Sequence, residues 1–319
     1  MKIYITGIAG FIGYHLATNF VEKGSRELKT YGNDVTGCDN FNSYYNPWLK
    51  ENRADLLKTF NINVHNKDII DLNEKDFKDI DVIVHLAAYA GVRNSLENPD
   101  NYINTNILGT QHIIKLAEKL QIPVVYASSS SVYAGQTPPF TESMEFKHHK
   151  NPYAWSKYVN ECQFKHSNLS SSIGFRFFTV YGPHGRPDMA LYKFTDKIIE
   201  DQPIEIYGHG EMSRDFTYVQ DIVNGVQLLI DKVKRINTHE IFNIGSGESI
   251  PLMKFVSLIE ENLGRKAKIK FSDMHKADIR HTLADITNIK KLGYVPMTNI
   301  ENGIRDFVEW YKSYFNLKT

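Results

Sequence analysis

The sequence predicts an α/β protein, built on a doubly wound parallel sheet with a smaller C-terminal α/β lobe. In the first half of the chain, short runs rich in β-branched residues alternate with amphipathic stretches of helix length. That order produces right-handed βαβ units around a buried parallel sheet. The chain has 319 residues, more than one compact domain usually contains. We therefore expect two parts.

The predicted elements follow one another regularly along the chain. Strands are expected at residues 2–6, 35–39, 62–65, 82–87, 124–127, 173–178 and 240–244, and helices at 11–23, 102–120, 152–166, 252–263 and 300–318. After residue 182, proline and glycine become frequent and the regular alternation stops. We expect a nucleotide-binding domain over 1–180, to which 217–245 returns. A substrate-binding lobe would contain 181–216 and 246–319.

Composition excludes several classes of protein. Lys plus Arg and Asp plus Glu both total 37, so the chain lacks the excess positive charge of a general nucleic-acid binder. No apolar run approaches the ~18 residues of a membrane span, so no membrane partner is expected. The two cysteines, Cys38 and Cys162, lack metal-ligand spacing. We expect no metal and a reducing, cytoplasmic location.

A glycine-rich turn directly follows the first predicted strand. Gly7, Gly10 and Gly13 have the spacing Gly-x-x-Gly-x-x-Gly, and Phe11 and Ile12 begin the next helix. Glycines allow the backbone to approach a pyrophosphate, and the helix start offers free N–H groups to that anion. The strand before and the helix after weaken the alternative of an ordinary turn. The motif predicts a Rossmann-type dinucleotide site.

Acidic residues end the next two strands. A carboxylate at Asp39 would accept the adenosine ribose hydroxyls and select NAD over NADP, unless it is a solvated loop acid. It lies 26 residues after Gly13, more than the usual ~20, which we attribute to an insertion at Ser25–Asn33. Asp68 and Ile69 follow the third strand, where Asp68 would either meet the adenine or cap the strand end.

The strongest catalytic signal is the pair Tyr153 and Lys157, which are four residues apart. Asn151 and Pro152 form a good helix start, so both side chains should share one helix face. A lysine ammonium can lower the pKa of a phenol from about 10 towards neutrality, making the tyrosine a general base. Ser129, at a strand end, could share the substrate proton. The pair alone could be a surface contact, but the accompanying motifs strengthen the catalytic interpretation.

Together these motifs resemble the extended short-chain dehydrogenase/reductase family of nucleotide-sugar epimerases and dehydratases, over essentially the whole chain. The further matching segments are 85–88, 106–110, 128–133, 181–183 and 214–216. The resemblance implies that Asn106 supports the active-site backbone and that Arg214 holds the substrate diphosphate. It also implies a homodimer formed through the helices at 102–120 and 152–166. The cofactor contacts expected for NAD are Gly7, Gly10, Phe11, Ile12, Gly13, Asp39, Asn40, Asp68, Ile69, Leu86, Ala87, Ala88, Asn106 and Lys157.

Segments 90–95 and 176–189 look most like those of the UDP-glucuronate 4-epimerases. That resemblance implies that Thr179 and Arg186 hold the sugar carboxylate, which a guanidinium can bind bidentately. A diphosphate or surface contact is the alternative for Arg186. Ser130 and Ser131 stand where the family's dehydratases and decarboxylases carry an acid. The expected substrate contacts are Arg93, Ser129, Ser130, Tyr153, Thr179, Arg186, Arg214 and Asp278.

The function expected from this resemblance is that of an isomerase, a homodimeric NAD-dependent UDP-hexose 4-epimerase. Its reaction would convert UDP-glucuronate to UDP-galacturonate for polysaccharide biosynthesis, with Ser129, Tyr153 and Lys157 as catalytic residues. Four alternatives stay open: a UDP-glucose or UDP-N-acetylglucosamine 4-epimerase, a UDP-glucuronate decarboxylase, a nucleotide-sugar 4,6-dehydratase, and a non-catalytic NAD-binding regulator.

Overall fold

The structure, a computed structural model, describes residues 1–27, 35–146, 151–274 and 278–317, without the side chains of 22–27. Most of the insertion expected at Ser25–Asn33 therefore lies outside the described residues. The chain forms two compact units. The first contains residues 1–134, 148–176 and 223–242, and the second contains residues 135–147, 177–222 and 243–319.

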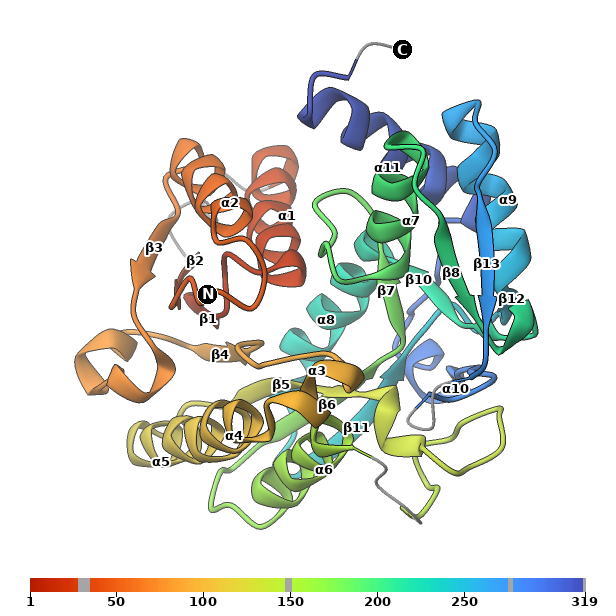
Figure 1. Ribbon diagram of the computed structural model, residues 1–319. Coiled ribbons are helices and arrows are strands. Elements are labelled where there is room, and N and C mark those ends of the chain that lie inside the picture. Colours follow the sequence, from red (N-terminus) through yellow and green to blue (C-terminus); the bar gives the residue numbers. More distant parts are fainter. Residues whose placement is uncertain (28–34, 147–150, 275–277, 318–319) are drawn as a thin grey trace. The chain divides into compact units, whose positions relative to one another are not determined.

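The first unit contains a seven-stranded sheet in the order β11-β6-β5-β4-β1-β2-β3 (Figure 1). The strands are β1 (Ile3–Thr6), β2 (Val35–Asp39), β3 (Asn63–Asn66), β4 (Val82–His85), β5 (Val124–Ser129), β6 (Ser172–Phe177) and β11 (His239–Ile244). The pairs among β1 to β5 are parallel. The strand order reverses between β1 and β4, and such a switch point is where doubly wound sheets bind ligands. The predicted parallel α/β sheet is confirmed.

Helices cover both faces of this sheet, with α1 and α2 on one side and α5 and α6 on the other (Figure 1). They are α1 (Phe11–Glu27), α2 (Trp48–Thr59), α3 (Val92–Glu97), α4 (Pro99–Asn101), α5 (Thr110–Leu120) and α6 (Pro152–Lys165). Short 3-10 turns occupy Ile69–Asp71, Glu74–Phe77 and Ser130–Tyr133. Residues Tyr4, Ile83, Val124, Ile113 and Phe164 are among those that form the core between the sheet and the α5 and α6 side.

The helix predicted over 102–120 is confirmed as helical, but its first half, Tyr102–Gly109, is a π-helix that precedes α5 and not an α-helix. Side chains of α6 draw the backbone carbonyls of this segment away from the regular ladder. Asn160 Nδ2 donates to the Asn106 carbonyl at 2.6 Å, and Gln163 Nε2 donates to the Ile107 carbonyl at 3.1 Å. A widened turn of this kind is typical where side chains insert into the helical hydrogen-bond ladder.

In the part of the second unit that the structure describes, the strands form three two-stranded sheets, accompanied by helices. Its strands are β7 (Thr179–Tyr181), β8 (Ile204–Tyr207), β9 (Ser213–Arg214), β10 (Phe216–Tyr218), β12 (Ile250–Pro251) and β13 (Ile269–Ser272). The helices are α7 (Ala190–Ile199), α9 (Leu252–Leu263), α10 (Thr287–Lys290) and α11 (Ile300–Tyr314), and α8 (Val219–Val233) continues into the first unit.

Two further observations concern the helices and the surface. The helix predicted over 300–318 ends at Tyr314, since the chain turns into the left-handed region at Asn316, where φ is 52°.

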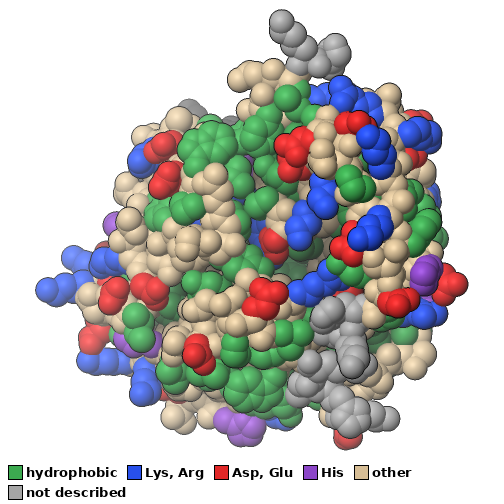
Figure 2. Space-filling model, in the orientation of Figure 1, with side chains coloured by type: hydrophobic (Ala, Val, Ile, Leu, Met, Phe, Trp, Pro, Cys, Tyr) green, Lys and Arg blue, Asp and Glu red, His purple; other side chains and the backbone are tan. Residues whose placement is uncertain are grey.

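Among the described residues, no helix is long and apolar enough to cross a membrane. On the face drawn in Figure 2, positive and negative side chains are interspersed. That mixture agrees with the net charge of zero.

Candidate active site

The glycine turn packs so tightly that side chains are excluded from it. Gly7 has a φ of +71°, which favours glycine, and its N–H donates to the Cys38 carbonyl at 2.7 Å. A Cβ on Gly13 would lie only 2.3 Å from the Gly7 carbonyl oxygen. The start of α1 therefore lies directly against the end of β1. This leaves the first N–H groups of α1 available to an anion, so the turn fits a dinucleotide pyrophosphate.

The segment Leu86–Ala88 lies beside this turn, because a Cβ on Gly7 would come within 2.9 Å of the Ala87 nitrogen. Ala87 N–H donates to Thr6 Oγ1 at 3.2 Å, and Thr6 Oγ1 lies 2.8 Å from His85 Nδ1. His85 Nε2 lies 3.0 Å from Thr110 Oγ1. Burial lowers the pKa of His85 to about 3, so the ring is neutral and serves to hold the end of β4 in place.

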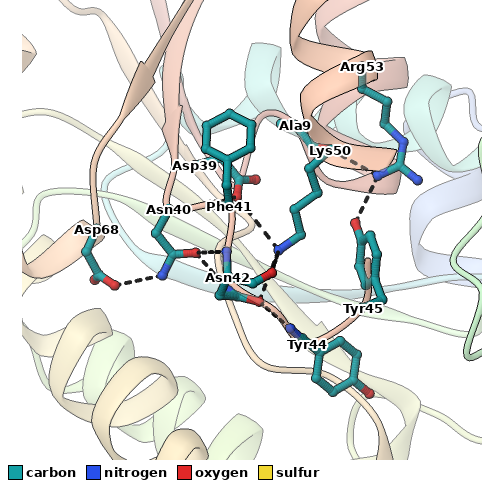
Figure 3. A network of polar contacts seen from close by, with 10 residues as sticks. All are labelled: Ala9, Asp39, Asn40, Phe41, Asn42, Tyr44, Tyr45, Lys50, Arg53 and Asp68. Atoms are coloured by element: carbon teal, nitrogen blue, oxygen red, sulfur yellow. Dashed lines mark hydrogen bonds and ion pairs between the residues drawn. The ribbon is translucent and has the colours of Figure 1, made fainter. Parts of the chain in front are cut away.

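Asp39 is 7% exposed at the end of β2, beside a lysine that sequence reasoning missed (Figure 3). Its Oδ1 accepts a hydrogen bond from Phe41 N–H at 2.9 Å and lies 4.0 Å from Lys50 Nζ. Burial raises the pKa of Asp39, and the ammonium of Lys50 opposes that shift. Lys50 Nζ also donates to the carbonyl and the side-chain oxygen of Asn42, at 3.0 Å each. A buried acid held in this way suits ribose recognition.

Asp68 acts as a cap in this structure. Its Oδ1 accepts from Ile70 N–H at 3.2 Å, and its Oδ2 accepts from Asn40 Nδ2 at 2.7 Å. The contact with Asn40 ties the ends of β2 and β3 together. The side chain of Ile69 is buried in the core, so any cofactor contact by Ile69 would come from its backbone.

Tyr153 and Lys157 lie one turn apart on α6. Asn151 caps this helix, since its Oδ1 accepts from Ala154 N–H at 2.8 Å. The Tyr153 ring is half-buried and makes an edge contact with the Tyr102 ring, with centroids 6.1 Å apart. Lys157 is 5% exposed and donates from Nζ to the Ala127 carbonyl at 2.9 Å. Burial lowers the pKa of Lys157 to about 8, so a cation is held at low dielectric beside the tyrosine's helix turn.

The serines at the end of β5 have different surroundings. Ser128 Oγ donates to Glu161 Oε1 at 2.5 Å and is buried. Ser129 Oγ accepts from Ser131 N–H and donates to Ser131 Oγ, both at 3.1 Å, and it caps the 3-10 turn that follows. Ser130 is half-buried. Ser129 can exchange its local acceptor for a substrate hydroxyl without loss of a buried partner.

A buried ion pair that sequence reasoning missed lies behind these serines. Arg176 Nε and Nη2 donate to Glu161 Oε1 and Oε2 at 2.9 and 2.8 Å. Arg176 Nη1 also donates to Tyr133 Oη at 2.7 Å. Both side chains of the pair are less than 5% exposed. The position of Glu161, one helical turn after Lys157, was the signal available in the sequence.

Asn106 is fully buried and makes three contacts through its side chain. Its Oδ1 accepts from Tyr89 N–H at 2.8 Å, and its Nδ2 donates to the Tyr89 carbonyl and to Ser156 Oγ, at 2.9 Å each. It therefore joins the segment after β4 to α6. Arg93 is exposed on α3.

The remaining predicted substrate residues, Thr179, Arg186, Arg214 and Asp278, belong to the second unit. Thr179 opens β7 and is half-buried. Arg186 Nε donates to Asp188 Oδ1 at 2.9 Å, and its Nη2 donates to Asp188 Oδ2, so the guanidinium already forms a two-point carboxylate contact. Asp278 is half-buried.

Two backbone carbonyls hold the guanidinium of Arg214. Its Nη1 donates to the carbonyls of Ser213 and Arg280, both at 2.9 Å. The next residue, Asp215, is fully buried and accepts backbone N–H groups of Ser246 at 2.8 Å and Ala284 at 3.0 Å. Burial raises the pKa of Asp215, and these donors oppose the shift. The carboxylate thus joins three separate segments at the base of Arg214.

The profile of the NAD dependent epimerase/dehydratase family matches residues 3–245. The chain belongs to this family. It is 38% identical over 325 residues to the UDP-glucuronate 4-epimerase of Thermodesulfobacterium geofontis. The alignment covers 98% of this chain and 97% of the relative. Its fold matches a crystal structure of the Bacillus cereus UDP-glucuronic acid 4-epimerase in complex with UDP-glucuronic acid and NAD, with a TM-score of 0.89 and 29% identity. That match covers 98% of this chain and 100% of the other.

The fold also matches the structure of a Tyr-to-Phe variant of the same Bacillus cereus enzyme, with a TM-score of 0.90 and 29% identity. That variant is in complex with NAD and a 4-deoxy-4-fluoro analogue of UDP-glucuronic acid. The match covers 98% of this chain and 100% of the other. In our protein, the glycine turn and the buried Asp39 fit NAD as the cofactor. Among the residues that the structure describes, no three His, Cys, Asp or Glu side chains are grouped to hold a metal ion.

Proposed function

We propose that this protein is a UDP-glucuronate 4-epimerase that forms UDP-galacturonate. The observation that carries the proposal is the arrangement on α6, where Lys157 is buried one turn after Tyr153. Ser129, the capping serine at the end of the neighbouring strand β5, completes the catalytic set that we propose. Relatives named for this reaction, with NAD and UDP-glucuronic acid bound in one of them, support the choice of substrate.

In this mechanism Tyr153 takes the proton from the 4-hydroxyl of the sugar. The ammonium of Lys157, in its low-dielectric position, favours the ionised form of that phenol. Ser129 holds the same hydroxyl with its Oγ, which in this structure is hydrogen-bonded to Ser131. NAD supplies, when bound, the hydride acceptor at carbon 4 and the donor that returns the hydride to the opposite face. Tyr153 then returns the proton, and no net oxidation occurs.

The second unit supplies the binding groups of this proposal. We assign Arg214 to the diphosphate, and Thr179 and Arg186 to the sugar carboxylate. A 4-keto-uronic acid is a β-keto acid, which loses carbon dioxide when its carboxyl bond stands perpendicular to the carbonyl plane. A two-point contact by Arg186 would hold the carboxylate ionised and out of that geometry. To do so, Arg186 must exchange Asp188 for the substrate.

We also propose a homodimer formed through the π-helix and α6. Three large apolar side chains on these elements are exposed: Ile103 by 38%, Leu108 by 53% and Trp155 by 43%. The exposure of Trp155, a large aromatic side chain, favours an interface at this helix. The cytoplasm and a role in polysaccharide biosynthesis stay predictions. The free thiols of Cys38 and Cys162 are in keeping with a reducing compartment.

The test of the proposed reaction follows purified protein by proton NMR and mass spectrometry, with UDP-glucuronate or UDP-glucose and with and without added NAD. UDP-galacturonate formed at constant mass is the expected product. Loss of carbon dioxide or water would make the protein a lyase. Turnover of UDP-glucose alone would overturn the carboxylate assignment. No turnover of either, together with tight NAD binding, would favour a regulator.

The carboxylate assignment has its own variant. Arg186→Ala should either release the 4-ketopentose by-product or lower turnover by about 100-fold, as expected when a charged substrate contact is lost. The matched control is Arg305→Ala, which removes an exposed arginine of the same unit. An Arg186→Ala enzyme with the wild-type rate and no by-product would remove Arg186 from the site.

A further inference from the structure

Helix α2 carries a buried cation that has no part in the sequence motifs or in the proposed mechanism. Arg53 is 1% exposed. Its Nη1 donates to the Ala9 carbonyl at 3.1 Å and to Tyr45 Oη at 2.9 Å. The guanidinium carbon lies 5.7 Å from the centre of the Tyr45 ring. Figure 3 shows the side chain extending from α2 toward Ala9, with Tyr45 below it. Removing a guanidinium from water is costly, so such burial calls for an explanation.

The acceptor of this hydrogen bond is part of the glycine turn. Ala9 lies between Gly7 and Gly10, so its carbonyl belongs to the loop that leads into α1. In a turn that binds an anion, N–H groups must face the ligand and carbonyls must face away from it. The bond from Arg53 fixes the direction of the Ala9 carbonyl. It thereby helps to present the first N–H groups of α1 to a diphosphate.

Arg53 also brings positive charge to this turn. A buried charge is screened little by solvent and salt, so its attraction for a nearby anion is larger than that of a surface lysine. The Ala9 carbonyl and the Tyr45 hydroxyl that accept its hydrogen bonds are neutral groups, and its charge also reaches the buried carboxylate of Asp39, where it opposes the rise in pKa that burial causes. Tyr45, in the loop between β2 and α2, keeps the guanidinium in position.

We propose that Arg53 is a positioning residue for the diphosphate of the cofactor, and that Tyr45 supports it. The inference rests on the assignment of NAD to the glycine turn. Arg53→Met should raise the dissociation constant for NAD by about 10- to 100-fold, the range expected when a charged hydrogen-bond donor is lost. Arg53→Lys keeps the charge without the planar fork and should lie between this variant and wild type. Tyr45→Phe should weaken binding less than Arg53→Met does.

The experiment titrates NAD into the cofactor-free full chain by calorimetry, and ADP and adenosine by ligand-observed NMR. The control is Lys58→Met, which removes an exposed lysine of the same helix. A diphosphate role predicts that Arg53→Met weakens NAD and ADP but leaves adenosine within about twofold of wild type.

Two results would overturn the inference. One is an Arg53→Met protein that binds NAD as the wild type does. The other is a protein that loses ADP and adenosine equally, which would show a merely structural role. If Arg53→Met does not fold, Arg53→Lys and Tyr45→Phe decide by the same comparison of ADP with adenosine. Failure of the wild type itself to bind NAD would instead refute the cofactor assignment.

Discussion

Replacing Lys157 by methionine should abolish activity and yet stabilise the cofactor-free protein. The side chain is 5% exposed, and burial lowers the pKa of Lys157 from 10.5 to about 8. Because one pKa unit corresponds to roughly 1.4 kcal/mol, the buried charge costs the fold about 3 kcal/mol at pH 7. Methionine fills a similar volume without the charge. It leaves the Ala127 carbonyl without its donor, which costs about 1–2 kcal/mol. The net gain is about 1–2 kcal/mol.

The pH dependence of this gain follows from linkage. Below pH 8 the folded and the unfolded wild type both carry the charge, so the penalty is complete. Between pH 8 and 10.5 the folded form loses its proton first, and the wild type becomes more stable as the pH rises. The advantage of the variant should therefore disappear over this interval. Glu161 keeps its partner Arg176 in the variant, so no new unpaired carboxylate offsets the gain.

The assay is urea unfolding of cofactor-free wild type and Lys157→Met at pH 7, 8, 9 and 10, with epimerase activity measured at pH 7. Lys165→Met, at the exposed end of the same helix, is the control and should stay within about 0.5 kcal/mol of wild type. A variant less stable than wild type at pH 7, or a difference that does not change with pH, would refute the reasoning.

Three further predictions concern the cofactor, the buried ion pair and the assembly. Asp39→Ser should lower the dissociation constant for NADP relative to that for NAD at least about 10-fold in calorimetry, because a carboxylate no longer repels the 2′-phosphate; an unchanged ratio would show that Asp39 does not contact the ribose. Glu161→Gln should lower the free energy of unfolding in urea by about 3–5 kcal/mol, because Arg176 loses a buried charged partner. Asp55→Asn, in an exposed pair, should lower it by less than about 1 kcal/mol, and equal losses would contradict the prediction. Trp155→Glu should shift the proposed dimer to monomer in light scattering with an unchanged circular dichroism spectrum, and a dimer that persists would place the interface elsewhere.

Local features of the sequence determined the glycine turn and the pair Tyr153 and Lys157, to which we assign cofactor binding and catalysis. The glycine turn could be predicted because strand, turn and helix are adjacent in the chain, and because Gly10 and Gly13 both lie against the carbonyl oxygen of Gly7, within seven residues. The contact of Gly7 itself with the Ala87 backbone is long-range and was not visible in the sequence. Tyr153 and Lys157 could also be predicted, since four residues make one helical turn whatever the surroundings. The Asn151 cap and the Asp39 strand end were likewise local signals.

Only the tertiary structure decided which side chains support these groups. Arg53 and Ala9 are 44 positions apart in the chain, and no periodicity relates them. The same is true of the Asp215 carboxylate, whose donors come from segments 31 and 69 residues away. The π-helix at Tyr102–Gly109 also escaped prediction, because its altered ladder depends on side chains that α6 contributes. Local spacing fixes turns and helix faces, whereas burial and long-range hydrogen bonds exist only once distant segments have packed together.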